Sequence, residues 1–300
     1  MDDLDHRIRL AAFQAVRRLD AIHGGAIPWA DITRGFTVDG QQVMLSGRAR
    51  GIFPPRQMRR GLLSIKTTVP RQGRRRRYED IASDDGFFQY RFMGDDPANA
   101  DNRALREAWE DRTPFIYLHG IAPTLYQAIW PVFVTHWDAG SLSAQVVPGE
   151  WRRDAATLSD AADLRRYAVI EAKKRLHQAV FRELVLQAYR GRCALSNLPE
   201  RRLLHAAHIL PDRDERGRPV VSNGISMSVL HHSAYDLNLL GIDPDGVIHL
   251  NRDLLGIHDG PTLASLQGLE GERIWVPDEP GQRPNRDFLA VRYEQFRAAA

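Results

Sequence analysis

Three polar residues in the second half of the chain stand at intervals that suit hydrolysis at a metal. His208 is followed by Asn223 fifteen residues later and by His232 nine residues after that. Hydrolysis of a phosphate ester needs a neutral imidazole that takes a proton from water and a divalent cation that holds a phosphate oxygen. It also needs a scaffold that keeps the two close together. We therefore take these three residues as candidate catalytic groups.

The elements around these residues would place them together. The apolar run LLHAAHILP ends at a proline, which favours a short buried strand that presents His208 at its end. The charged segment that follows contains Gly and Pro and reads as a surface loop. Residues 225–241 show helical spacing closed by Gly241, so His232 and Asp236 would share one helix face and grip one cation. An imidazole and a carboxylate favour Mg²⁺ or Mn²⁺, and also admit Ni²⁺ or Co²⁺.

The order His, Asn, His with these intervals resembles the HNH nucleases of the ββα-metal fold. The resemblance implies that His208 is the general base and that Asn223 orients it. It implies that His232 and Asp236 are metal ligands in a one-metal endonuclease. In that family the residue before the base is usually a ligand, but here it is Ala207. Either two protein ligands and water hold the metal, or His205 reaches in from the same strand.

The alternative is a purely structural role, in which these histidines are ordinary hydrogen-bonded side chains of a small α/β domain. Four polar residues in register favour a site. The single cysteine, Cys193, cannot supply the two CxxC pairs of a structural zinc, so none is expected, and we interpret it as a small core residue. A lone thiol also fits a reducing compartment.

A basic segment precedes this region. Residues 45–77 contain ten Arg and one Lys with no Asp or Glu, although the whole chain carries a formal charge of only +3. Such a segment needs a polyanion or the rest of the fold to offset its charge; a solvated loop or a localisation tag is the alternative. Arginine favours bidentate phosphate contacts. The expected DNA-backbone contacts, including two lysines further along the chain, are Arg48, Arg50, Arg56, Arg59, Arg60, Arg74, Arg75, Arg76, Lys173 and Lys174.

Aromatic residues after the basic segment alternate with polar ones, as in strands with one buried face. An aromatic cavity with a nearby carboxylate is what reading a flipped base requires. The runs YED, DDGFFQY and DNRAL resemble the SRA domain of the PUA superfamily, which flips 5-methylcytosine or 5-hydroxymethylcytosine. The resemblance covers roughly residues 40–145. It implies a modified-base pocket that contains Tyr78, Asp80, Asp84, Phe88 and Tyr90.

Together these features predict an α+β protein with two domains. Residues 1–150 would form an SRA/PUA-like β-barrel with flanking helices. Residues 151–300 would hold a long linking helix, from about residue 162 to 190, and an HNH domain with its motif core at 190–245. We expect a leading helix at 4–22 and a boundary without regular structure at 138–164. No run of eighteen apolar residues occurs, and 43% hydrophobic content suffices for two cores.

The functional interpretation is a modification-dependent restriction endonuclease in the bacterial cytosol or nucleoid. Its expected partners are double-stranded DNA with modified cytosine and a second copy of the chain, because two strands must be cut; no membrane partner is expected. Two alternatives stay open. One is a DNA-binding reader with a degenerate nuclease domain, motivated by Ala207. The other is an HNH nuclease that reads phosphorothioate DNA, RNA or an unmodified sequence.

Overall fold

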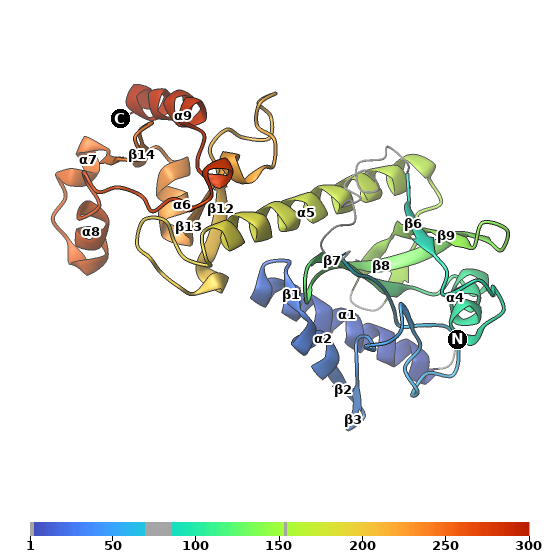
Figure 1. The fold of residues 1–300 in the computed structure, drawn as a ribbon. Coiled ribbons are helices and arrows are strands. Elements are labelled where there is room, and N and C mark those ends of the chain that lie inside the picture. The colour runs from blue at the N-terminus through green and yellow to red at the C-terminus, as the bar shows by residue number, and fades with distance from the viewer. Residues whose placement is uncertain (1–2, 70–85, 153–154, 300) are drawn as a thin grey trace. The chain divides into compact units, whose positions relative to one another are not determined.

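The computed structural model describes residues 3–69, 86–152 and 155–299 (Figure 1). The chain divides into two compact units, Met1–Ala179 and Val180–Ala300. The dividing point lies inside α5 (Ala162–Ala188), the long helix that the sequence predicts. The expected irregular boundary at 138–164 is wrong in part, because three short strands lie there. The buried sequence SAQVVP lacks the alternation that would have indicated one of these strands.

The first unit is built on a curled mixed sheet that forms half of a barrel (Figure 1). Within the described residues the strands follow the order β4-β5-β7-β8-β9-β6, and β1 pairs with β8. Only β5 and β7 run parallel among these pairs; the others are antiparallel. The strands are β1 (Ile27–Pro28), β4 (Ile52–Phe53), β5 (Ser64–Thr67), β6 (Phe88–Arg91), β7 (Phe115–Ala122), β8 (Leu125–Asp138) and β9 (Ser143–Pro148).

Helices cover one face of this sheet. The leading helix α1 (Asp3–His23) was expected at 4–22, and it packs with α2 (Trp29–Arg34) over the apolar face. Strand β7 shows how the sequence separates the two faces. Ile116 and Leu118 join the core under α1, so Tyr117 and His119 point to the opposite face. Two small hairpins complete the unit, β2 (Phe36–Val38) with β3 (Gln41–Val43) and β10 (Glu150–Arg152) with β11 (Ala155–Thr157).

Helix α4 (Ala100–Glu110) is tied to the end of β6 by the NRAL run. Asn99 caps the helix, since its Oδ1 accepts a hydrogen bond from the Asn102 amide at 2.9 Å. The fully buried Asn102 side chain accepts from the Met93 amide and donates to the carbonyls of Met93 and Asp96. The run therefore closes the turn between a strand and a helix.

The second unit packs the end of α5 and several short elements around one core. Phe181, Val185 and Tyr189 of α5 enter that core.

Cys193 is buried, as expected, and its Sγ lies 3.3 Å from His231 Nδ1. Burial raises the pKa of this thiol, but hydrogen bonds from His231 and Ser196 outweigh it and bring the pKa to about 6. The elements are β12 (Leu204–His208), β13 (Gly224–Ser228), α6 (Val229–Asp236), β14 (Leu240–Ile242), β15 (Ile248–Leu250), α7 (Arg252–Leu255), α8 (Gly260–Gln267) and α9 (Arg286–Ala299), with 3₁₀ turns η1 (Arg201–Leu203), η2 (Val221–Asn223) and η3 (Pro280–Gln282).

Among the helices that the structure describes, none combines the length and the apolar character needed to cross a bilayer.

Candidate active site of the second unit

A strand pair followed by a helix positions the candidate catalytic residues. Strands β12 and β13 are antiparallel, with His208 opposite Gly224. The helix expected at 225–241 is shorter than predicted, because its first residues form β13 and Gly241 lies in β14. Ser228 starts α6, since its hydroxyl accepts a hydrogen bond from the His231 amide at 3.2 Å. A strand buried on both faces does not alternate, which is why the spacing was misread as helical.

His208 is held between α5 and the loop that follows β12. Its ring stacks on Phe181 with centroids 4.1 Å apart. Gly224 permits this approach, because a Cβ there would lie 2.5 Å from Val185 Cγ2 and 2.8 Å from Phe181 Cζ. His208 Nε2 lies 3.1 Å from Asp212 Oδ1, a contact without hydrogen-bond angles. Burial lowers the pKa of His208, and the Asp212 charge opposes that shift only in part. The imidazole is therefore neutral at pH 7, as a general base must be.

Asn223 fastens the two ends of the loop after β12. The side chain is fully buried. Its Oδ1 accepts from the Leu210 amide at 2.9 Å, and its Nδ2 donates to the Leu210 carbonyl at 3.0 Å and to the Arg218 carbonyl at 3.2 Å. These bonds fix the backbone two residues beyond His208. The geometry suits the orienting role that the family resemblance implies.

We expect Asn223→Ala to lower the free energy of unfolding by about 2–4 kcal/mol, because two buried backbone groups of Leu210 and the partly buried Arg218 carbonyl lose their partner. Urea denaturation monitored by circular dichroism measures the change. Asn223→Asp should restore little of this stability, because its carboxylate cannot donate and would face the Leu210 and Arg218 carbonyl oxygens. Equal stability of all three proteins would show that the loop does not depend on this side chain.

His205 and His232 face one another across β12 and α6. Their Nδ1 atoms are 3.1 Å apart and their rings are perpendicular. Suppose that two imidazole nitrogens bind one cation, each with a bond of about 2.1 Å, and that the nitrogen–metal–nitrogen angle is between about 90° and 109°. The two nitrogens then lie roughly 3.0–3.4 Å apart. The pair therefore fits two ligands of one ion. Burial, reinforced by the neighbouring His232 and Arg182, lowers the pKa of His205, which favours the neutral form that binds metals.

Asp236 lies on the other side of the His232 ring. Its Oδ2 is 3.3 Å from His232 Nε2, whereas His232 Nδ1 faces His205. A carboxylate behind a metal-binding histidine fixes the ring and raises its basicity. Over the described part of the chain, no group of three or more His, Cys, Asp or Glu side chains is arranged to hold a metal ion. The geometry thus favours His205 and His232 as ligands, with Asp236 as the support of His232.

The expected DNA-backbone residues occupy different environments. Arg48, Arg56 and Lys174 are exposed, and Lys173 is buried with its Nζ 5.8 Å from the centre of the Phe88 ring. Arg50 lies 3.4 Å from Asp101. The remaining members, Arg74, Arg75 and Arg76, lie outside the described residues.

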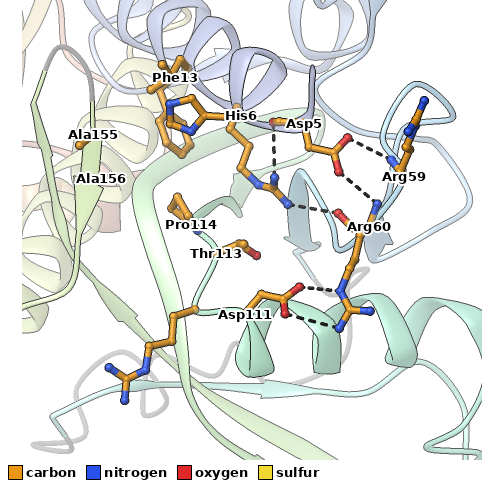
Figure 2. A pocket seen from close by; sticks show the side chains of 13 residues that line it. Asp5, His6, Phe13, Arg59, Arg60, Asp111, Thr113, Pro114, Ala155 and Ala156 are labelled. Atoms are coloured by element: carbon orange, nitrogen blue, oxygen red, sulfur yellow. Dashed lines mark hydrogen bonds and ion pairs between the residues drawn. The ribbon is translucent and has the colours of Figure 1, made fainter. Parts of the chain in front are cut away.

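Arg59 and Arg60 line a cavity of about 660 Å³ beside the start of α1 (Figure 2). The Asp5 carboxylate accepts hydrogen bonds from both of their amides, and the Arg60 guanidinium forms two hydrogen bonds with Asp111. Arg9 donates to the carbonyls of Asp5 and Arg60, and its burial lowers its pKa to about 10 despite both nearby carboxylates. The chain's own carboxylates therefore offset part of the positive charge of the basic segment.

Two of the five expected base-pocket residues are described, and they lie on the sheet face opposite α1. Phe88 and Tyr90 are buried on β6, and both rings meet Tyr117 edge-on, at 5.8 Å and 6.2 Å between centroids. Tyr78, Asp80 and Asp84 lie outside the described residues. Tyr117 and His119 were not among the expected residues, and the alternation of ring side chains with aliphatic ones in FIYLH is the signal that could have found them. Asp212 beside His208 was also missed, because it stands in a loop.

Comparison with known proteins agrees with this geometry in the second unit. Residues 193–243 match the HNH endonuclease family model, a span that contains every candidate catalytic residue named above. No curated protein matches the chain. Among solved structures, the "Modification dependent TagI restriction endonuclease" is similar at a TM-score of 0.31 and 15% identity, over 79% of this chain and 82% of that one. Residues 193–243 are an HNH endonuclease domain, and the chain is a metal-dependent endonuclease.

Proposed function

We propose that this endonuclease reads a modified cytosine in duplex DNA with its first unit and cleaves the backbone with its HNH domain. The observation that carries the first half is the cluster of three aromatic rings, Phe88, Tyr90 and Tyr117, on the sheet face opposite α1. A flipped base needs flat rings to pack against and fixed polar groups along its edge. Thr67 and His119 supply such groups beside Tyr117.

An SRA-like assignment of residues 1–150 is part of this proposal. The curled half-barrel and the turn closed by Asn102 support it, because the NRAL run has a defined structural role next to β6. Residues 151–300 would then carry the linking helix and the nuclease. We also propose that two copies act together, since cutting both strands requires two sites of opposite polarity.

In the proposed cleavage step His208 takes a proton from a water molecule. The water oxygen then attacks phosphorus in line with the leaving oxygen, and the bond between phosphorus and that oxygen breaks. Stacking on Phe181 and the loop pinned by Asn223 hold the imidazole in place. His205 and His232 would hold the divalent cation, Mg²⁺ or Mn²⁺ being the expected ions. A cation there supplies positive charge that stabilises the phosphate as negative charge develops on it.

The lowered pKa of His208 predicts the acidic limit of the reaction. A base whose folded pKa is below the ordinary value of 6.5 stays neutral as the pH falls through 6.5, so cleavage should persist there. We expect single-turnover rates at saturating Mn²⁺ to fall only below that pH. Metal affinity measured at each pH separates this effect from protonation of the ligands. A rate that is already halved above pH 6.5 would contradict the prediction.

The test of the proposed function is cleavage of one duplex that contains cytosine, 5-methylcytosine or 5-hydroxymethylcytosine, with Mg²⁺ and Mn²⁺ in parallel. Cleavage confined to modified DNA is expected. Tyr90→Ala should reduce the preference for modified DNA by about tenfold, because one stacked ring is worth roughly 1–3 kcal/mol. The cleavage that this variant retains should still depend on the metal. Equal cleavage of all three duplexes by the natural protein would discard base reading and leave the nuclease assignment intact.

A further inference from the structure

The cavity beside the start of α1 contains polar side chains that the first unit leaves unused. Three of the residues that line it are His6 on α1 and the consecutive Arg112 and Thr113, which lie between α4 and β7. Thr113 is only 7% exposed, yet its hydroxyl makes no hydrogen bond to any residue that the structure describes. Arg112 is exposed and His6 is half-buried, and within the described ranges neither side chain has an ion pair or a hydrogen bond. A ligand could therefore use all three groups.

A buried cation borders the same space. Arg9 is 2% exposed and donates hydrogen bonds to the carbonyls of Asp5 and Arg60. A Cβ built on Gly61, whose φ is +76°, would lie 3.0 Å from Arg9 Nη2 and 3.6 Å from Thr113 Oγ1. The Arg9 guanidinium and the Thr113 hydroxyl thus border one small space, and a glycine at this position keeps that space open.

The lining carries more positive than negative charge. It contains four arginines and two aspartates, namely Arg9, Arg59, Arg60, Arg112, Asp5 and Asp111. Asp5 accepts hydrogen bonds from two backbone amides, and Asp111 binds the Arg60 guanidinium, which also lies 3.6 Å from Glu110. No carboxylate of the described residues pairs with Arg112 in this way. The positive charge that Arg112 brings to the cavity favours an anion.

The size of the cavity and its apolar side indicate more than a simple ion. Figure 2 shows Phe13, Pro114, Ala155 and Ala156 on the side of the cavity away from the labelled arginines. The volume of about 660 Å³ falls within the range of small-molecule sites, roughly 300–1,000 Å³. An inorganic ion would leave the apolar side in contact with water. The arrangement therefore suits a molecule with an anionic group at one end and an apolar body at the other.

We propose that this cavity binds a free organic phosphate of about nucleotide size, with its phosphate against Arg112, Thr113 and His6. A phosphate monoester carries a charge of about −1.5 to −2 at pH 7 and offers three acceptor oxygens. A guanidinium can bind two of these oxygens side by side, and the threonine hydroxyl can donate to the third. The apolar body would pack on Phe13 and Pro114. The site lies on the α1 side of the sheet, away from the proposed base pocket.

The test is calorimetric titration of the full chain, without a divalent metal, with inorganic phosphate, phenyl phosphate and adenosine 5′-monophosphate. At least one of the two monoesters should bind at a single site and more tightly than inorganic phosphate. Adenosine, which lacks the charge, should bind at least about tenfold more weakly than its monophosphate. Arg112→Gln should weaken monoester binding by at least about tenfold and Thr113→Val by about three- to tenfold. Arg103→Gln, an exposed arginine of α4 outside the cavity, is the matched control and should leave the affinity unchanged.

A second arm separates a free phosphate from the phosphates of the DNA backbone. A saturating DNA duplex should leave the affinity for the monoester unchanged. Displacement of the monoester by the duplex would assign the cavity to the DNA backbone and overturn the proposal. The absence of binding by every phosphate probe, or binding that Arg112→Gln and Thr113→Val leave unchanged, would overturn it as well. If Thr113→Val does not fold, Arg112→Gln decides the question, since Arg112 is exposed.

Discussion

His208→Ala should lower the single-turnover rate of DNA cleavage by about 10²–10⁴-fold, the usual contribution of a general base. DNA affinity and Mn²⁺ affinity should change little, because the ring contacts Phe181 and Asp212 and takes no part in the His205–His232 pair. The rate is measured on one labelled duplex at saturating enzyme. Binding of the same duplex is measured without metal.

Two controls separate the chemical role of His208 from its packing. Added imidazole should restore part of the activity of His208→Ala, because the substitution leaves a space beside Phe181 in which the free base fits. The exposed His258 of the same unit provides a matched substitution, and His258→Ala should retain the full rate. Full activity in His208→Ala would refute the assignment of the base.

The grouping of the candidate catalytic residues was predictable because the contacts among them are local. His208, Asn223 and His232 lie within 25 positions, and one hairpin and one helix bring them together. Given a strand, a loop and a helix of those lengths, few arrangements exist. The start of α6 was not predictable from apolar spacing. The Ser228 cap marks it, and a buried strand precedes that cap.

The features that sequence reasoning missed depend on long-range packing. Arg60 is neutralised by Asp111, 51 positions away, and nothing local to the basic segment indicates that partner. The same holds for the contact between Thr67 and His119, 52 positions apart, because the parallel pairing of β5 with β7 brings them together. The alternation of ring side chains with aliphatic ones in β7 was visible in the sequence. Which of its faces α1 covers was not.

At the candidate metal site, spacing and geometry give different roles to Asp236. Helical spacing places His232 and Asp236 on one face and predicts that both bind the ion. In the structure Asp236 contacts His232 Nε2, on the side of the ring away from His205. A residue that supports a ligand typically changes metal affinity by 10–100-fold when it is removed. Removal of a ligand itself should lower metal affinity further, so affinity measurements distinguish the two roles.

His232→Ala should therefore weaken Mn²⁺ binding by more than about 100-fold and abolish cleavage at Mn²⁺ concentrations that saturate the natural protein. His205→Ala should behave in the same way, since the two Nδ1 atoms would share the ion. Asp236→Ala should lose only about 10–100-fold in affinity and regain cleavage when Mn²⁺ is raised. Calorimetric titration of Mn²⁺ gives the affinities without relying on activity.

Added imidazole should restore less activity in His232→Ala than in His208→Ala, because a free imidazole must compete with water for the ion. If Asp236→Ala lost as much affinity as His232→Ala, and His205→Ala lost none, the helix pair rather than the two facing histidines would be the metal site.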